Sequence, residues 1–280
     1  MSPKTQTRII RSKEWARPVR SVRREVISAR SVDEEPRPPI LFVPGYGHAA
    51  WVFEEHWLEH TASRGFPAYA MSLRGQGHSG SASGADLRAY VHDVVQVAAG
   101  LPRQAVLIGH GAGALVVAHA LARYPARAGV LLAPVFGGWR TFGGALAHNP
   151  IGTVPAIFGG RLRMRRRQLF GPNLHTSAAR VYLSRLGRQP ARAQWQLLMA
   201  PAPEAPVGDP PVLVAGTPDD RVVPRSSLNK VAARYGGAPL LFPGMGHDLM
   251  LDAGWAEPID AVIDWLSKAE HSTEQDAALT

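Results

Sequence analysis

The most distinctive chemical feature of the chain is a glycine-rich turn at residues 109–113, with the sequence GHGAG. The apolar run 105–108, which predicts a strand, leads into this turn, and a helical pattern follows it. In a nucleophile elbow, a strained strand-to-helix turn presents the nucleophile at its central residue. Here the central residue is Gly111, which adopts a positive φ without steric cost but has no nucleophilic atom. The turn therefore predicts the backbone of a nucleophile-bearing site without the nucleophile.

The same glycines also allow a phosphate-binding interpretation, because GxGxxG turns bind dinucleotides at the start of a helix. That motif requires a glycine at position 114, which is Ala114, and it normally follows the first strand of the fold. We therefore do not expect a dinucleotide, and the sequence implies no cofactor.

A second glycine turn, residues 44–48 (PGYGH), directly follows the apolar run 40–43. Backbone N–H groups in such a turn are suited to stabilising a developing oxyanion, together with the N–H of Ala112 behind the first turn. A turn that merely connects a strand to a helix has the same composition. The oxyanion interpretation therefore depends on the other segments.

An acid and a histidine follow the first glycine turn, which gives one of the chain orders in which catalytic triads occur. Asp219 and Asp220 come after a strand-like segment that ends at Gly216, and His247 lies in a glycine-flanked turn after the last strand pattern. An aspartate at the carboxyl end of a strand is well placed to orient a histidine. Each signal alone is weak, because surface turns have similar sequences. The order of nucleophile position, acid and histidine makes them one strong signal.

Short apolar runs alternate with helical patterns along the chain, which predicts an α/β fold with a mostly parallel sheet flanked by helices. Continuous apolar runs of this length are typical of strands buried on both faces. The expected strands are 21–31 (an edge strand), 40–43, 68–71, 105–108, 129–132, 212–214 and 240–242. The expected helices of the core are 86–101, with Asp86 as its N-cap, 226–235 and 255–266.

Residues 137–200 interrupt this alternation and are rich in Gly and Arg. They contain helical pieces around 180–186 and 192–199, and a segment of this length is best explained as a helical cap or lid over the active site. The expected organisation is a flexible basic arm (1–20), a core formed by 21–136 and 201–270, the cap (137–200) and a disordered tail (271–280).

From about residue 38 to residue 268, the chain resembles an α/β-hydrolase of the monoacylglycerol-lipase or esterase-like kind. The segments that carry the resemblance are PILFVPGYGHAAW, AMSLRGQGHSG, VLIGHGAGALVV, GVLLAPV, VLVAGTPDDRVVP and FPGMGHDLMLDAGW. The resemblance implies an α/β-hydrolase fold and a His247–Asp220 pair. It also implies an oxyanion hole made by the backbone N–H groups of Tyr46 and Ala112.

The resemblance leaves the identity of the acid open. Counted from the proline that follows it, the acid is Asp220, whereas counted from the glycine that ends the strand it is Asp219. His78 and His110 match positions that are commonly structural in the family.

Gly111 departs from the family pattern, and three interpretations follow. In the first, the chain is an enzyme without covalent catalysis. His247, oriented by an aspartate, is then a general base, and the oxyanion hole stabilises an enolate or a tetrahedral oxyanion. That chemistry supports cyclisation, elimination, C–C cleavage or direct hydrolysis of a small hydrophobic acyl or carbonyl metabolite. In the second, the chain is a serine ester or lactone hydrolase inactivated by replacement of its nucleophile. In the third, it is a non-catalytic binding protein on a hydrolase fold.

The expected cap combines apolar side chains with five arginines in residues 161–167. Apolar walls with a few cations suit a small hydrophobic ligand that carries a carboxylate or phosphate, although a solvated arginine face is the simpler alternative. The residues expected to contact the substrate are Gly45, His48, Trp139 and Phe170. The Ala-, Arg-, Gly- and Pro-rich composition suggests a GC-rich genome and a role in secondary metabolism.

The composition argues against several other functions. The chain has no cysteine, which excludes disulfides and thiolate catalysis, and its 11 histidines lack HExxH spacing, so we expect no metal site. No apolar run is long enough for a membrane span and no secretory signal is found, so a cytoplasmic location is expected. The net charge of +9 is concentrated in residues 1–30 and 137–200, but no nucleic-acid-binding motif accompanies it. Nucleic acid is therefore not an expected partner, and the oligomeric state stays open.

Overall fold

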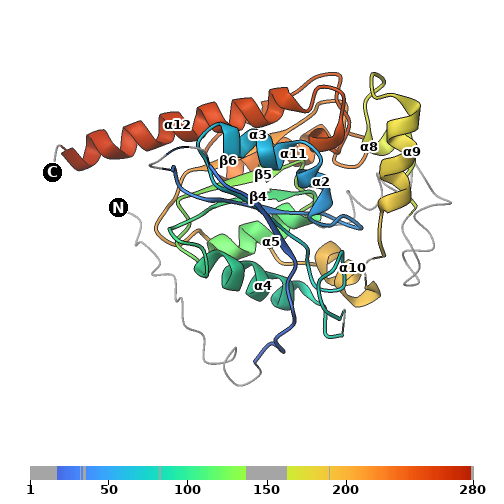
Figure 1. Ribbon diagram of the computed structural model, residues 1–280, viewed down its shortest axis with the longest axis horizontal. Coiled ribbons are helices and arrows are strands. Elements are labelled where there is room, and N and C mark those ends of the chain that lie inside the picture. The colour runs from blue at the N-terminus through green and yellow to red at the C-terminus, as the bar shows by residue number, and fades with distance from the viewer. Residues whose placement is uncertain are drawn as a thin grey trace.

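The protein has a central sheet with helices on both faces (Figure 1). The computed structural model describes residues 18–31, 33, 36–81, 83–136, 163–188 and 190–278. Within this part of the chain the strand order is β1-β3-β2-β4-β5-β6-β7, and only β1 runs antiparallel to its neighbour. The strands are β1 (Val26–Ala29), β2 (Ile40–Val43), β3 (Ala68–Met71), β4 (Val106–His110), β5 (Ala128–Leu132), β6 (Val212–Gly216) and β7 (Leu240–Leu241). The predicted α/β fold with a mostly parallel sheet is confirmed.

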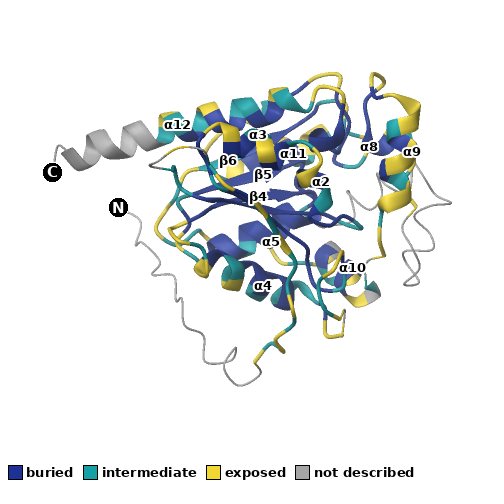
Figure 2. Cartoon of the chain, viewed as in Figure 1, coloured by how far each residue is buried: buried dark blue, intermediate teal, exposed yellow. Residues whose placement is uncertain are grey.

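The apolar sequence of the central strands explains their position between two helical layers. All residues of β2, β4 and β5 are buried, because helices cover both faces of the sheet. Figure 2 shows this buried interior running through the middle of the molecule. One apolar cluster includes side chains of α2 (Trp51–Glu54), α3 (Trp57–Ser63), the 3-10 helix η1 (Leu249–Leu251) and α12 (Ala256–Ala278). The other includes side chains of α4 (Leu87–Ala99), α5 (Ala112–Leu121) and α11 (Arg225–Arg234).

The predicted core elements are present, with shifts at their ends. β2 and β3 begin and end where the sequence predicts, and Asp86 caps α4 by accepting a hydrogen bond from the N–H of Ala89 at 2.8 Å. The last helix differs from the prediction, because α12 continues to Ala278. Residues 271–278 are therefore helical in backbone, where the sequence led us to expect a disordered tail.

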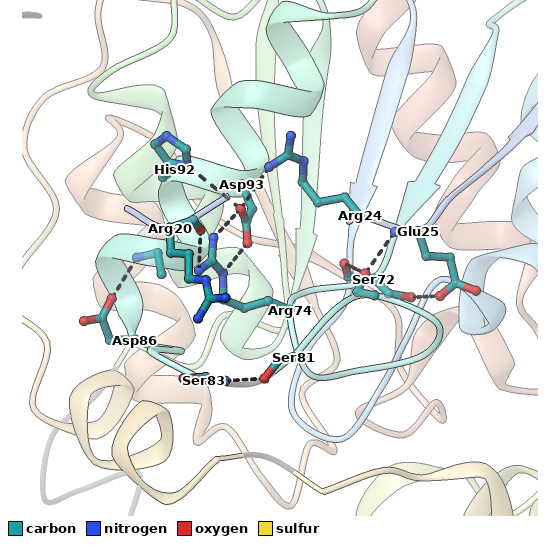
Figure 3. A network of polar contacts seen from close by, with 12 residues as sticks. Arg20, Arg24, Glu25, Ser72, Arg74, Ser81, Ser83, Asp86, His92 and Asp93 are labelled. Atoms are coloured by element: carbon teal, nitrogen blue, oxygen red, sulfur yellow. Dashed lines mark hydrogen bonds and ion pairs between the residues drawn. The ribbon is translucent and has the colours of Figure 1, made fainter. Parts of the chain in front are cut away.

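The segment before β1 is attached to the core by a buried ion pair (Figure 3). The guanidinium of Arg74 binds both carboxylate oxygens of Asp93 at 2.6 Å and donates to the carbonyl of Arg20 at 3.2 Å. Arg24 contacts the same carboxylate at 3.3 Å. The chain is thus held from residue 20 onward, whereas residues 1–17 of the expected flexible arm lie outside the described residues.

In the described part of the segment expected to form a cap, three helices lie between β5 and β6. They are α8 (Arg166–Leu169), α9 (Thr176–Arg185) and α10 (Ala191–Leu198), and α9 and α10 overlap the two predicted helical pieces. Figure 1 shows α8 and α9 together at one end of the sheet. Residues 137–162 lie outside the described part of the chain. Among the helices that are described, none is long and apolar enough to cross a membrane.

Candidate active site

Four loops meet at one edge of the sheet. The turn at residues 44–48 follows β2, Gly111 follows β4, the Asp219–Asp220 pair follows β6 and His247 follows β7. These four strands are parallel, so their carboxyl ends lie at the same edge. Ligands of open α/β sheets bind outside this edge, which makes it the place to look for a site.

Gly111 forms the sharp turn between β4 and α5, with φ 55° and ψ −119°. Another residue would adopt this conformation only at a cost of about 1–3 kcal/mol. The N–H of Gly111 donates to the carbonyl of Leu132 at 2.9 Å, and its carbonyl accepts from the N–H of Val135 at 3.0 Å. A Cβ on Gly113 would lie 2.5 Å from the carbonyl oxygen of Val43, so only glycine allows α5 to approach β2 this closely. The expected strand-to-helix turn is present.

His247 and Asp220 form a buried hydrogen-bonded pair. Nδ1 of His247 lies 2.8 Å from Oδ2 of Asp220, and the two side chains are 6% and 3% exposed. The other carboxylate oxygen of Asp220 accepts from the N–H groups of Val222 and Val223 at 2.7 and 2.9 Å. These backbone donors fix the carboxylate, which in turn orients the imidazole ring.

The contacts of the two adjacent aspartates distinguish them. Asp219 is exposed, and its Oδ2 accepts a hydrogen bond from the N–H of Gly244 at 2.7 Å. Its own N–H donates to the hydroxyl of Thr217 at 3.1 Å. Asp219 is therefore engaged with the backbone of the next loop, and Asp220 is the member of the pair that contacts His247.

Opposing effects set the protonation of His247. Burial lowers its pKa, but the negative charge of Asp220, the hydrogen bond to Asp220 and the negative charge of Asp248 outweigh burial. The pKa of His247 is therefore raised above its ordinary value of 6.5. The result is an oriented imidazole with increased basicity.

The other ring nitrogen of His247 faces the position of the nucleophile. A Cβ built on Gly111 would lie 3.2 Å from Nε2 of His247 and 3.9 Å from Cα of Gly45. A side-chain hydroxyl at residue 111 would therefore lie within hydrogen-bonding reach of Nε2. The structure brings Gly111, His247 and Asp220 together in the arrangement that the sequence predicts.

The turn at residues 44–48 packs against the start of α5. A Cβ on Gly45 would lie 3.0 Å from the carbonyl oxygen of His110 and 3.5 Å from the backbone nitrogen of Ala112. Ala112 is the first residue of α5, so its N–H has no acceptor within the helix, and the helix dipole adds positive potential there. The two predicted oxyanion donors, Tyr46 and Ala112, thus belong to backbone segments that lie in contact beside Gly111.

Two hydrogen bonds connect this turn to the segment between β5 and β6. The N–H of Gly187, after α9, donates to the carbonyl of Gly47 at 2.6 Å. The hydroxyl of Tyr46 donates to the carbonyl of Gln194, in α10, at 2.9 Å. The part of the expected cap that is described therefore lies directly against the candidate oxyanion turn.

The four residues expected to contact substrate differ in where they lie. The ring of His48 is buried and bonded to Asp248, so its polar edge is used inside the protein. Phe170 is also buried, with its ring centroid 5.9 Å from that of Tyr182. Neither position supports a substrate contact. Gly45 lies in the turn beside Gly111, and Trp139 is outside the described residues.

Sequence reasoning missed Asp248, because an acid next to a loop histidine has no distinguishing signal. With His48 and His110 it forms a buried cluster whose candidate ligand atoms all lie within 4.8 Å of one another. Two imidazoles and a carboxylate are also a common ligand set for transition metals, although the sequence predicts no metal site. The residue types alone do not decide between a metal site and a hydrogen-bonded cluster.

Comparisons with known proteins agree with the fold. Residues 40–265 match the sequence profile described as the alpha/beta hydrolase family. A search of curated proteins found no match. The chain is similar in structure to a monoacylglycerol lipase from Paleococcus ferrophilus, with 17% identity, a TM-score of 0.67, and 89% of this chain and 100% of that chain covered.

Two further solved structures have similar folds. A soluble variant of monoglyceride lipase from Saccharomyces cerevisiae, in complex with a substrate analog, has 12% identity and a TM-score of 0.71, covering 88% of this chain and 91% of that chain. A thermophilic esterase from Thermogutta terrifontis has 17% identity and a TM-score of 0.65, covering 89% and 94%. At these identities the likeness shows a shared fold and carries no activity over to this chain.

Proposed function

Because this chain belongs to the alpha/beta hydrolase family, we propose that it is an enzyme that acts without a covalent nucleophile, with His247 as general base. Asp220 orients the base, and the N–H groups of Tyr46 and Ala112 stabilise the developing oxyanion. The α/β-hydrolase fold that the sequence predicts is confirmed by the family match and the sheet topology. The substrate class we propose is a small hydrophobic acyl or carbonyl metabolite.

One observation carries the proposal. Nε2 of His247 lies 3.2 Å from the point where the Cβ of residue 111 would be, and residue 111 is glycine. The base is therefore oriented toward a position that holds no protein nucleophile. A water molecule or a substrate proton placed there would meet an imidazole whose other nitrogen is already bound to a carboxylate.

Direct hydrolysis of an ester or lactone illustrates the chemistry. His247 Nε2 takes a proton from water while the water oxygen bonds to the acyl carbon, and the electron pair of the carbonyl moves onto its oxygen. The resulting oxyanion faces the N–H groups of Tyr46 and Ala112. When the tetrahedral intermediate collapses, the bond to the leaving oxygen breaks and the imidazolium returns the proton to that oxygen.

The rate enhancement expected from these groups is moderate. A positioned general base contributes roughly 10²–10⁴-fold in rate. One oxyanion-hole donor contributes roughly 10²–10³-fold. The same groups can remove a proton next to a carbonyl and stabilise the enolate, which supports cyclisation, elimination or C–C cleavage of the same substrate class.

The second candidate function is that of a serine ester or lactone hydrolase inactivated at its nucleophile. The backbone of Gly111 favours this candidate. Its φ of 55° and ψ of −119° are those of a turn that would be strained for serine, and a chain with glycine there has no nucleophile for the turn to present. A third candidate, a binding protein on the same fold, requires no proton transfer at His247.

Turnover of a panel of activated esters and lactones by the wild-type protein and His247→Ala tests the proposal. We expect measurable turnover by the wild type that falls by roughly 10²–10⁴-fold in the variant, because the base is lost while the oxyanion donors remain. Equal rates in the two proteins would contradict general-base catalysis. A ligand that raises the melting temperature of both proteins without turnover would favour the binding protein.

A further inference from the structure

A buried cluster beneath the candidate site joins three of its loops. His48 comes from the turn after β2, His110 ends β4 directly before Gly111, and Asp248 follows His247. These residues are 3%, 1% and 0% exposed, so none of them is placed to meet substrate. Burial of polar groups lowers the stability of the fold unless they are hydrogen-bonded, so the partners of these three side chains matter.

The hydrogen bonds of the cluster run between the loops. Nε2 of His48 lies 3.0 Å from Oδ2 of Asp248, and Nε2 of His110 lies 3.1 Å from the carbonyl oxygen of His247. Nε2 of His110 is also 3.6 Å from Oδ1 of Asp248, beyond hydrogen-bond distance but within charge range. The N–H of Asp248 donates to the carbonyl of Leu169 at 2.8 Å. His48 thus connects the oxyanion turn to the loop of the catalytic base, and His110 connects that loop to the turn at Gly111.

The acceptors fix which nitrogens carry protons. A carbonyl oxygen only accepts, so Nε2 of His110 donates, and burial lowers the pKa of His110 to about 3. Burial raises the pKa of Asp248, but the hydrogen bond from His48 and the electrostatic interactions with the neighbouring histidine rings lower it below its ordinary value. Asp248 is therefore a carboxylate that accepts from the Nε2–H of His48, beside a neutral His110.

The same assignment argues against a metal ion in the cluster. A metal bound at the two Nε2 atoms would move each proton to Nδ1. Metal-bound histidines almost always donate this second N–H to an acceptor. In the described structure the Nδ1 atoms of His48 and His110 are buried and have no hydrogen-bond partner. The hydrogen-bonded arrangement satisfies more of the donors.

We infer that Asp248, His48 and His110 are positioning residues, which hold the oxyanion turn, the turn at Gly111 and the His247 loop in register. Asp248 additionally places a fixed negative charge beside the catalytic base. This role rests on the proposed function of His247, because a base and an oxyanion hole act together only when their distance is fixed. The groups that face His247 are Asp220 after β6, His110 at the end of β4 and Asp248 in its own loop, with His48 behind Asp248.

The test is a histidine NMR titration of nitrogen-15-labelled wild type, Asp248→Asn and Asp252→Asn. Asp252 is a matched control, since it is a buried aspartate of the same loop. Among the described residues its carboxylate accepts only from the backbone N–H groups of Gly171, Gly246 and Ala253. We expect the pKa of His247 to fall in Asp248→Asn and to stay unchanged in Asp252→Asn. An unchanged His247 titration in Asp248→Asn would overturn the inference, as would equal shifts in both variants.

A second pair of variants keeps the inference testable if Asp248→Asn does not fold. His48→Gln retains an N–H donor for Asp248, and His48→Leu removes it. We expect the amide signals of Tyr46 and Gly47 to be broadened in His48→Leu. In His48→Gln the same signals should have their wild-type line widths. Unchanged signals in His48→Leu would overturn the link between Asp248 and the oxyanion turn.

Titration of the wild type with Zn²⁺ separates the two interpretations of the cluster. We expect no stoichiometric binding, whereas one Zn²⁺ bound per chain and lost in Asp248→Asn would overturn the hydrogen-bonded arrangement. None of these readouts uses turnover. The inference can therefore fail while the proposed activity holds, and the activity can fail while the inference holds.

Discussion

Two aspartate–histidine pairs of the candidate active site include the adjacent residues His247 and Asp248, and they have different surroundings. Asp220 and His247 are joined at 2.8 Å, and Asp248 and His48 at 3.0 Å. Nε2 of His247 faces the side-chain position of residue 111, whereas Nδ1 of His48 is buried without a partner among the described residues. In the proposed function the first pair takes a proton from water or substrate, whereas the second holds loops together and places the charge of Asp248 beside His247.

An aspartate–histidine pair is therefore not by itself a catalytic unit. What decides is whether the second nitrogen of the ring meets the reacting atoms. In the proposed function that nitrogen belongs to His247, and water or substrate replaces the nucleophile that Gly111 lacks.

Gly111→Ser is expected to have the largest effect, because it gives the first pair a nucleophile to activate. We expect ester hydrolysis to rise by roughly 10⁴-fold or more, since loss of the nucleophile in a serine hydrolase costs about 10⁶-fold. A fluorophosphonate probe should label the variant and leave the wild type unlabelled.

Gly111→Ser/His247→Ala is the control for this gain, and it should not be labelled. Serine at a φ of 55° should also lower the free energy of unfolding by about 1–3 kcal/mol. A variant that folds but gains neither rate nor label would show that the pocket no longer supports acyl transfer.

Asp220→Asn should remove most of the advantage of the first pair. An asparagine cannot supply the negative charge that raises the pKa of His247, and it disturbs the tautomer of the ring. We expect the wild-type rate to fall by about 10²-fold, within the total contribution of a general base. Asp219→Asn, at the neighbouring position, is the matched control and should change the rate by less than about threefold. Equal losses in the two variants would contradict the assignment of Asp220.

The pH dependence of the wild-type rate should report the protonation of His247. The base works when neutral, and its pKa is raised, so we expect the rate to fall by about tenfold per pH unit below a midpoint above pH 6.5. In Asp220→Asn the midpoint should move to lower pH, because the carboxylate that favours the protonated ring is absent. A rate that does not change on the acidic side would exclude His247 as the base.

His247 and His110 should also differ in their protonation between pH 5 and 8, in the absence of any substrate. Burial keeps the pKa of His110 at about 3, whereas that of His247 lies above 6.5. We expect NMR spectra between pH 5 and 8 to show His247 changing protonation while His110 stays a neutral Nε2–H tautomer. A His110 ring that takes up a proton in this range would contradict the buried, neutral cluster.

The fold was predictable because its strands are continuous apolar runs and its turns have strong glycine signals. The choice between Asp219 and Asp220 was not predictable, because the sequence does not give the direction in which each side chain leaves the loop. His48 and Phe170 were expected to meet substrate, but sequence does not tell whether a polar or aromatic side chain faces a pocket or the core. Asp248 was missed because its importance comes from burial beside three histidines, two of which, His48 and His110, are distant in sequence. The length of α12 was underestimated, since its last turns are polar.

The most direct test of non-covalent catalysis at His247 is intact-mass spectrometry of the wild-type protein, quenched during turnover of an activated ester. We predict an unmodified mass for the wild type while product accumulates, and an acyl adduct on Gly111→Ser under the same conditions. An acyl adduct on the wild-type chain would contradict the account, because it would show that another residue supplies the nucleophile that Gly111 lacks.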